Sequence, residues 1–160
     1  MSGCLYQGRR LRTLKILDEG LREALAIEID TSWPAARVVR TLQQLITWRG
    51  GPQAIGLDNR PELTAQRFTT WCAVMGIELR HLQPGKPKQN AFIERFKRSY
   101  RTEVLKGWLF APLGEVREIT HQWIITYNEE RPHHAFGNLP PAGYRERLLA
   151  GLYSTWQRST

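Results

Sequence analysis

The sequence predicts an α/β fold in which a mixed β-sheet is flanked by helices. Short segments rich in Leu and Ile, of strand length, alternate with longer segments whose apolar residues recur at helical spacing. Gly and Pro mark the boundaries between these segments. The resulting order is strand, strand, helix, strand, helix, strand, helix, helix, which is typical of a sheet with helices on both faces.

The first predicted feature is an antiparallel hairpin. Its strands cover 13–18 (TLKILD) and 24–29 (ALAIEI), and a turn-prone Glu-Gly pair lies between them. A helix follows, because Asp-Thr-Ser at 30–32 can cap its start and Pro34 suits a first helical turn. Apolar residues then recur at helical spacing as far as Arg49, where we expect the helix to end.

A strand, a helix and another strand come next. Residues 54–57 form a brief apolar strand, and the polar, proline-containing stretch 58–62 forces the chain out of the sheet. Asp58 is therefore expected at the carboxyl end of a strand. The pattern over 63–75 is helical and a glycine stops it, after which 77–82 is predicted as a strand.

Two long helices are predicted after a basic loop. The stretch 83–89 contains two prolines and a glycine, which break both helices and central strands, so Lys86 and Lys88 are expected on a loop. One helix is predicted over 90–105 and another over 114–128, where apolar residues recur at helical spacing.

The charge balance points to a polyanionic partner. The chain has 160 residues, which suits one domain, and 23 Lys and Arg against 15 Asp and Glu give a net charge of +8. Basic charge alone favours nucleic acid only modestly, since many basic proteins are simply well solvated. Hydrophobic residues at 41%, with six Trp, exclude a disordered basic tail.

Cysteine usage and hydropathy favour a cytoplasmic location. Cys4 and Cys72 form no metal-type pair and are too few for a disulfide framework, so a reducing compartment fits best. Apolar runs fall far short of the roughly 18 residues of a membrane span. The N-terminal stretch lacks the apolar core of a secretory signal, so we expect the chain to stay where it is made.

The strongest chemical candidate is a pair of acids, Asp58 at a strand end and Glu94 near the start of the 90–105 helix, with 35 residues between them. Two carboxylates can hold divalent cations, and neighbouring basic groups can clamp phosphate oxygens, as phosphoryl transfer requires. The side chains that share the helical stripe of Glu94 are polar or basic: Asn90, Lys97, Arg98 and Arg101.

The alternative is an exposed helix face on which Glu94 pairs with Arg98, an arrangement worth only tenths of a kcal/mol. On the residues alone, this alternative carries the greater weight.

Two segments favour the catalytic interpretation of Glu94 over the exposed ion pair. They are LDNRPELTAQRFTTWCAVMGIELRHLQPGKPKQNAFIERFKRSYRTEVL and YNEERPHHAFGNLPPAGY. They resemble the integrase catalytic core of bacterial insertion-sequence transposases, the DDE group, which is similar to retroviral integrases. The match runs from about Gly8 to Tyr144. It combines the strand-end Asp-Asn, the acid spacing, the Pro-Gly-Lys-Pro loop, the Asn-Ala-Phe-Ile-Glu helix start and the Tyr-Asn-x-x-Arg-Pro-His block in one order.

The resemblance implies an RNase H-like fold in which three acids bind two Mg²⁺ (or Mn²⁺) ions and catalyse DNA cleavage and strand transfer. Asp58 matches the second acid and Glu94 the third, as catalytic residues and metal ligands. DNA, both element ends and target, is the implied partner of a homo-oligomer. The implied DNA-binding residues are Lys86, Lys88, Asn90, Lys97, Arg98 and Arg101. Asn59 is a further supporting or DNA-contacting candidate, and helix capping is the alternative for Asn90.

Two departures from the family pattern affect the site. Arg60 stands where the family usually has Gly, which predicts strain in the turn that presents Asp58. The family's first acid falls just before Met1, so we expect an N-terminally truncated core that lacks the first strand. Asp18 and Asp30 are the nearest substitutes for that acid, but turn and cap roles are the default for both.

Other candidates have ordinary structural alternatives. The four histidines lack the spacing of a zinc site and are expected on the surface or in loops, although His81 could touch DNA. Phe68, Trp71 and Trp123 could stack on bases, but their helical spacing favours core packing. Lys86 and Lys88 could close over DNA or belong to a plain solvated loop.

The domain prediction is an integrase-like core over 1–138, incomplete at its N-terminus, and a Pro-rich tail with a short helix over 139–160. The predicted function is transposase-type DNA cleavage and strand transfer, impaired by the missing acid. The sequence leaves open whether the chain is an enzyme, because a non-catalytic DNA-binding remnant is the main alternative. An RNase H-like ribonuclease is a remote third.

Overall fold

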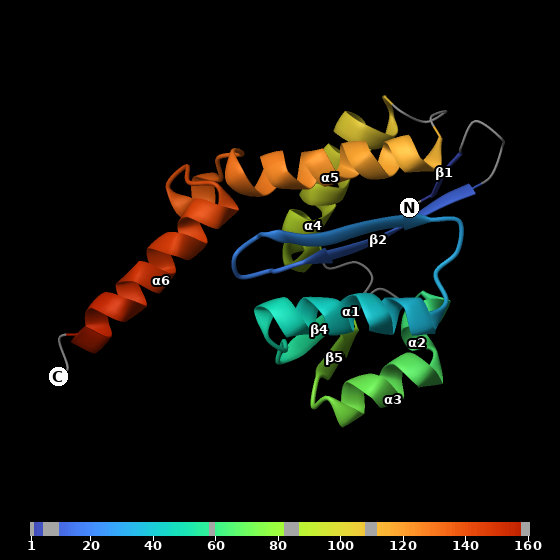
Figure 1. The fold of residues 1–160 in the computed structure, drawn as a ribbon, viewed down its shortest axis with the longest axis horizontal. Coiled ribbons are helices and arrows are strands. Elements are labelled where there is room, and N and C mark those ends of the chain that lie inside the picture. The colour runs from blue at the N-terminus through green and yellow to red at the C-terminus, as the bar shows by residue number, and fades with distance from the viewer. Residues whose placement is uncertain (1, 5–9, 58–59, 82–86, 108–111, 158–160) are drawn as a thin grey trace. The chain divides into compact units, whose positions relative to one another are not determined.

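The chain divides into two compact units, seen in the computed structural model of Figure 1. The first unit joins Met1–Ile29 to Phe92–Thr160, and the second covers Asp30–Ala91. The structure describes residues 2–4, 10–57, 60–81, 87–107 and 112–157. Glu94 and the basic stripe beyond it belong to the first unit, and the 54–57 strand that leads to Asp58 belongs to the second.

The first unit contains a three-stranded sheet in the order β1-β2-β3. Strand β1 (Ser2–Cys4) pairs antiparallel with β2 (Arg10–Leu17), and β3 (Ala24–Asp30) follows β2 through a short turn. The Asp18 amide donates to the Glu23 carbonyl at 2.9 Å and closes that turn. The predicted hairpin is therefore confirmed.

The prediction that the sheet lacks a strand ahead of the hairpin is wrong. β1 occupies that place, with Ser2 opposite Arg12 and Cys4 opposite Arg10. Its sequence, Ser-Gly-Cys, has neither the length nor the apolar alternation that identifies a strand, but ladder formation requires only backbone donors and acceptors.

Three helical segments supply the other side of this unit's core. They are α4 (Pro87–Tyr100), the π-helical turn η1 (Arg101–Leu105) and α5 (Leu113–Glu129). The prediction of a helix over 90–105 was three residues late, because Pro87 needs no amide partner at a helix start. Lys88 accordingly lies in α4 and not in a loop.

Aromatic side chains dominate the core between the strands and these helices. Phe96 meets Trp123 and Tyr127 edge to face, with ring centres 5.4 and 5.0 Å apart. Tyr100 also packs edge-on against Trp123, and its hydroxyl hydrogen-bonds Thr120 Oγ1 at 2.8 Å inside the core. The buried and partly buried apolar residues packed together include Leu11, Ile27, Ile29, Val104, Val116 and Ile119. The core role expected for Trp123 is confirmed.

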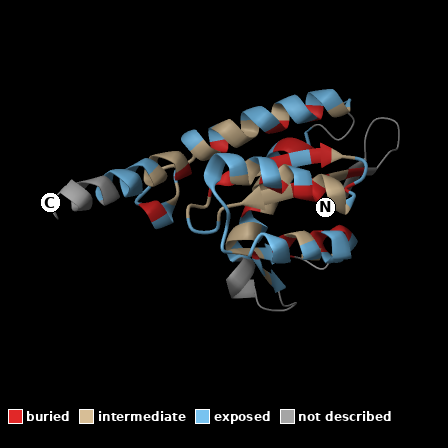
Figure 2. Ribbon diagram, turned by 60° about the horizontal axis from the view of Figure 1, so that its bottom comes forward, coloured by how far each residue is buried: buried red, intermediate tan, exposed pale blue. Residues whose placement is uncertain are grey.

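The unit ends with a short 3-10 helix, η2 (His134–Phe136), and a longer helix, α6 (Pro141–Gln157). At seventeen residues, α6 exceeds the short helix predicted for the tail. Its first turn is anchored, since Pro141 is buried and Arg145 pairs with the buried Glu23 at 2.7 Å. Figure 2 shows α6 becoming exposed beyond this turn, and residues 146–151 are all exposed.

The second unit contains a parallel pair of strands, β4 (Ala54–Leu57) and β5 (Glu78–His81), with Ala54 opposite Glu78 and Leu57 opposite His81. Both strands were predicted, and the chain contains both antiparallel and parallel strand pairs, as the predicted class requires. Its helices are α1 (Ala35–Arg49), α2 (Pro61–Thr64) and α3 (Gln66–Val74).

One predicted helix in this unit is divided. The segment 63–75 forms the end of α2 and then α3, because Ala65 takes an extended conformation (φ −60°, ψ 138°) between them. Phe68 and Cys72, on the inner face of α3, are fully buried, as the helical spacing predicted. Burial raises the pKa of the Cys72 thiol.

Within the described residues, no helix is both long enough and apolar enough to cross a lipid bilayer.

Candidate functional site

Helix α4 has a buried inner face and an outer face on which Glu94 is exposed to solvent. Phe96 and Tyr100 on the inner face are 1% and 0% exposed, whereas the Glu94 side chain is 63% exposed. The helix is therefore held by its aromatic face while its acid remains accessible. This is the arrangement that the helical stripe predicted for Glu94.

The basic partner of Glu94 is Lys97. The Lys97 Nζ atom donates to Glu94 Oε1 at 2.9 Å, three positions along the helix. The alternative interpretation placed Arg98 in this role, but the observed ion pair is with Lys97. Arg98 and Arg101 are both exposed on the same stripe. An exposed pair of this kind contributes little to stability, so Glu94 can exchange Lys97 for another cation at small cost.

The second predicted acid, Asp58, lies outside the described residues, as do Asn59 and Lys86. Strand β4 ends at Leu57, the residue before Asp58 in the sequence, and the site role of Asp58 stays a prediction. Lys88 and Asn90 belong to α4. Asn90 is the fourth residue of that helix, so the capping alternative for it is wrong.

Arg60 causes no backbone strain of the kind predicted. It precedes α2 with φ −83° and ψ 144°, an extended conformation open to any residue. Its carbonyl accepts the Leu63 and Thr64 amides, both at 3.0 Å. Replacement of the family's glycine by Arg60 is therefore compatible with the start of α2.

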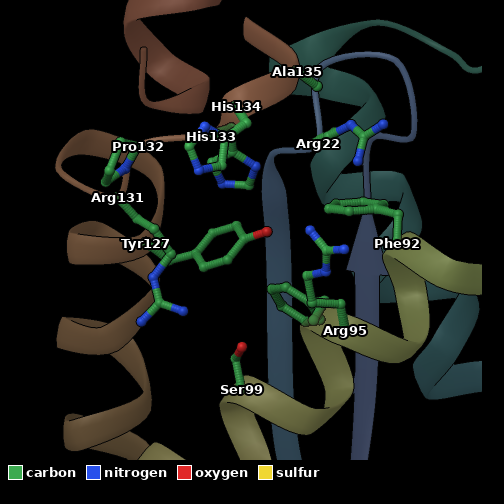
Figure 3. Close-up of a pocket in the computed structure, with 11 residues that line it drawn as sticks. Arg22, Phe92, Arg95, Ser99, Tyr127, Arg131, Pro132, His133, His134 and Ala135 are labelled. Atoms are coloured by element: carbon green, nitrogen blue, oxygen red, sulfur yellow. The ribbon is translucent and has the colours of Figure 1, made fainter. Parts of the chain in front are cut away.

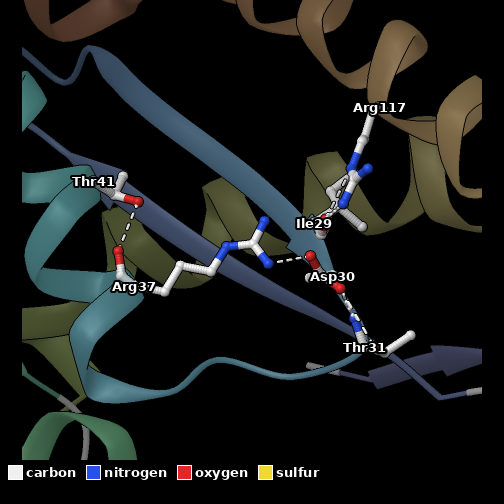
Figure 4. Close-up of polar contacts among 6 residues, drawn as sticks. All are labelled: Ile29, Asp30, Thr31, Arg37, Thr41 and Arg117. Carbon is white, nitrogen blue, oxygen red and sulfur yellow. Dashed lines mark hydrogen bonds and ion pairs between the residues drawn. The ribbon is translucent and has the colours of Figure 1, made fainter.

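Asp18 and Asp30 have the structural roles that were their default. Asp18 Oδ1 accepts the Leu21 amide at 2.8 Å within the hairpin turn. Asp30 accepts the Thr31 amide at 2.6 Å and pairs with Arg37, as Figure 4 shows. Both carboxylates hold local structure, and nothing in these contacts indicates a metal ligand.

The described part of the chain contains no group of three or more His, Cys, Asp or Glu side chains placed to hold a metal ion. Glu94 offers the hard oxygen donor that Mg²⁺ and Mn²⁺ prefer, but a single exposed carboxylate does not make a cation site. The donor chemistry fits a divalent ion if Asp58 supplies a second carboxylate.

The Tyr-Asn-x-x-Arg-Pro-His block connects the end of α5 to the rest of the first unit. Asn128 holds the start of β3: its Oδ1 accepts the Ala24 amide and its Nδ2 donates to the Ala24 carbonyl, both at 2.9 Å. Arg131 pairs with Glu103, which also accepts Trp123 Nε1 at 2.6 Å. The block therefore links the end of α5 to the start of β3 and to η1. The sequence did not reveal this role.

A hollow of about 150 Å³ lies beside this block (Figure 3). We call it the arginine hollow, since Arg22, Arg95 and Arg131 line it. Sequence reasoning missed it. The spacing of Phe92, Arg95 and Ser99 along α4 is a helical stripe that could have been noticed, whereas nothing in the sequence singles out Arg22. The remaining lining residues are Phe96, Tyr127, Pro132, His133, His134 and Ala135.

Burial and positive charge act together on two side chains of the hollow. Burial, followed by the charges of Arg22, Arg131 and Arg95, lowers the pKa of His133 below its ordinary value. Burial raises the pKa of Tyr127 to about 12, although the same three arginines oppose that shift. His133 is therefore neutral and Tyr127 protonated at neutral pH.

Comparison with known proteins identifies the class. Residues 2–87 and 75–141 each match the protein family described as Integrase core domain. The chain is 39% identical over 140 residues to an uncharacterized 39.2 kDa protein of the insertion element IS476 from Xanthomonas euvesicatoria, covering 88% of this chain and 40% of that protein. The chain belongs to the integrase core family found in insertion elements.

A second relative is the uncharacterized 31.7 kDa protein of the insertion element IS407 from Burkholderia multivorans, 36% identical over 91% of this chain and 53% of its own length. The chain thus spans about half the length of the curated relatives it matches.

Solved structures agree on the fold. The catalytic core domain of HTLV-2 integrase, in complex with magnesium, superposes with a TM-score of 0.67 at 16% identity, covering 86% of each chain. The catalytic core domain of BIV integrase gives a TM-score of 0.67 at 18% identity, covering 98% of this chain and 95% of that one. The fold is therefore RNase H-like, as the sequence resemblance implied.

Proposed function

We propose that this chain is the catalytic core of an insertion-element transposase, which cuts element ends and joins them to target DNA by metal-assisted phosphoryl transfer. Membership of the integrase core family and similarity to insertion-element proteins support this function. The observation that carries it is Glu94, an accessible carboxylate on a helix whose opposite face is locked in an aromatic core.

Glu94 and Asp58 would hold the divalent cation. When bound, Mg²⁺ or Mn²⁺ supplies activation of a water or DNA 3′-hydroxyl and stabilisation of the leaving oxygen, and a complete site of this type uses two ions. Glu94 would turn from Lys97 to the cation, and Lys97 Nζ would then be available to a phosphate oxygen. The buried Phe96 and Tyr100 keep the backbone of Glu94 fixed during this exchange.

The basic residues beyond Glu94 would position the DNA strand. Lys97, Arg98 and Arg101 follow the acid along one helical stripe, and Arg98 and Arg101 are exposed. Contacts of this type bind phosphates and confer no base specificity. We include Lys86, Lys88 and Asn90 in the same DNA-binding surface because they directly precede this stripe in sequence.

Partners follow from the same proposal. DNA, as element end and as target, is the substrate, and the net charge of +8 suits it. We propose that the protein acts as a homo-oligomer at the bacterial nucleoid, and the trimeric and dimeric forms described for HTLV-2 integrase core support an oligomer.

The test is a cleavage and joining assay on DNA carrying the element ends, with Mg²⁺ or Mn²⁺, run on the 160-residue chain. Glu94→Gln should abolish product while leaving DNA binding intact. Glu118→Gln, which removes an exposed acid from α5, is the matched control and should cleave normally. Equal activity of the Glu94→Gln variant and the parent protein would refute the catalytic role.

A second candidate function is DNA binding without cleavage. It is favoured by one observation: Arg98 and Arg101 are exposed on one helical stripe, where they can bind phosphates without a metal ion. This function predicts salt-sensitive DNA binding that survives Glu94→Gln and weakens on combining Arg98→Ala with Arg101→Ala, with no strand cleavage by the 160-residue chain. Cleavage by that chain would exclude it.

A further inference from the structure

The arginine hollow collects positive charge without a carboxylate to neutralise it. Among its lining residues there is no Asp or Glu. The Arg131 guanidinium is occupied, since it pairs with Glu103 and lies over the Tyr127 ring. Arg22 and Arg95, in contrast, form no ion pair with any described carboxylate. Two cations facing one space without an acid between them favour an anionic ligand.

The two arginines converge from separate elements. Arg95 comes from the exposed side of α4, and Arg22 comes from the turn between β2 and β3. Figure 3 shows the Arg95 guanidinium and the Tyr127 hydroxyl pointing into the shared space, while the Arg22 guanidinium lies over the Phe92 ring. The Arg22 guanidinium is 4.8 Å from the centre of that ring, a cation–π contact that orients it.

The backbone at Arg22 is strained. Its φ is +53°, a left-handed conformation that costs most residues about 1 kcal/mol or more and favours Gly or Asn. The turn is held in place by the bond from the Leu21 amide to Asp18 Oδ1 at 2.8 Å. An arginine kept at such a position is explained if its guanidinium has a ligand to bind.

A buried polar atom in the hollow also lacks a partner. His133 Nε2 is buried and makes no hydrogen bond within the described part of the chain. Such atoms are rare and usually indicate a missing ligand or water. The neutral imidazole can donate from Nε2 to an oxygen atom, and Ser99 and Tyr127 add hydroxyl groups to the same lining.

We propose that the arginine hollow is a phosphate-binding site, with Arg22 and Arg95 as its charged ligands and His133 and Tyr127 as neutral donors. Its volume of about 150 Å³ is several times the roughly 30 Å³ that one water occupies in the liquid, so a phosphate group fits. We assign the phosphate to a DNA backbone. This assignment rests on the proposed function, whereas the binding of phosphate itself does not. The site lies on a stripe of α4 distinct from that of Glu94, Lys97 and Arg101.

The first arm of the test uses inorganic phosphate and the intact 160-residue chain. NMR signals of the Arg95 side chain and the His133 imidazole should shift on phosphate titration and not on addition of equal chloride. Arg22→Gln and Arg95→Gln should each weaken binding about tenfold or more, as loss of a charge-assisted contact requires. Arg67→Gln, an exposed arginine on α3 with the same charge change, should bind as the parent does.

Folding is checked separately, since Arg22 lies in a turn. Circular dichroism melts should be the same for the Arg95→Gln and Arg67→Gln variants, and Arg95→Lys should recover part of the phosphate affinity because it restores the charge. Absence of a phosphate-dependent shift, or unchanged affinity in the Arg95→Gln variant, would overturn the site.

The second arm measures duplex DNA binding against salt concentration. The slope of log K against log salt should fall by about 0.9 in Arg22→Gln and Arg95→Gln, as expected for one lost phosphate contact. Phosphate binding that is lost in both variants without this change in slope would refute DNA as the source. The phosphate titration does not depend on Glu94, whereas the cleavage assay does, so failure of the catalytic proposal is distinguishable from failure of this one.

Discussion

The two units differ in how their side chains are tied together. In the first unit, polar contacts span long stretches of sequence: Asn128 holds Ala24, and Arg117 donates to the Ile29 carbonyl at 3.0 and 3.1 Å (Figure 4). In the second unit, ion pairs such as Asp30 with Arg37 link near neighbours. In the unit that carries Glu94, side-chain hydrogen bonds thus connect segments that are far apart in the sequence.

The hydrophobic cores of the two units also differ. Phe96 and Tyr100 in the first unit belong to a network of aromatic rings that also contains a buried hydroxyl pair. In the second unit, Phe68 and Cys72 are buried on the inner face of α3, and the Phe68 ring lies 6.3 Å from the ring of Trp71. Interlocked rings permit fewer alternative packings, so the helix that presents Glu94 is held in one position.

The largest predicted effect comes from removing one phenylalanine from each unit. Phe96→Ala and Phe68→Ala, at sites 1% and 0% exposed, should each cost about 3–5 kcal/mol. If the units are independently packed, hydrogen exchange should accelerate mainly in the first unit for Phe96→Ala and mainly in the second for Phe68→Ala. Uniform acceleration throughout the chain in both variants would show that the units unfold together.

Alkaline pH should destabilise the first unit selectively. Burial raises the pKa of both Tyr100 and Tyr127 to about 12, from an ordinary value of 10. A raised phenol pKa means that the folded state retains the proton, so stability is complete below pH 10 and is lost as pH rises towards about 12, by about 2–3 kcal/mol per tyrosine.

Tyrosinate absorbance and circular dichroism followed together test this prediction. The two signals should change in one step for the parent protein, and Tyr100→Phe should reduce the pH dependence. Ionisation of all five tyrosines near pH 10, with the fold intact, would contradict it.

A smaller effect is expected from the Asn128 contacts. Asn128→Ala removes both hydrogen bonds to the buried Ala24 backbone, and about 2 kcal/mol should be lost in urea unfolding. Gln122→Ala, on an exposed position of α5, is the control and should change stability by less than about 0.5 kcal/mol. Equal stability of the two variants would show that the long-range brace is unimportant.

The smallest effect concerns the second unit. Hydrogen bonding and charge from Arg80 lower the pKa of Glu78, which is exposed. Arg80→Ala should raise the pKa of Glu78 towards its ordinary value in an NMR titration, without a measurable change in unfolding midpoint. A clear loss of stability would show that local ion pairs matter more in this unit than the comparison implies.

Much of the fold was predictable because local patterns were strong. The hairpin, α1, β4, β5 and α5 match their predicted segments closely, and the exposed face of α4 followed from helical spacing around Glu94. β1 was missed because three residues give no periodicity, and the early start of α4 was missed because Pro87 was taken as a breaker when it begins the helix. The site predictions at Asp58 and Lys86 stay predictions.

The sequence by itself determined the class of the protein, the exposed position of Glu94 and the basic stripe beyond it, because a helix repeat places residues on faces without reference to anything else. Only the tertiary structure decided which distant groups meet. Arg22 and Arg95 share one hollow, and Asn128 binds the start of β3, since chain folding brings together residues that no local spacing relates. The long-range contacts of the first unit and the arginine hollow are therefore properties of the folded unit.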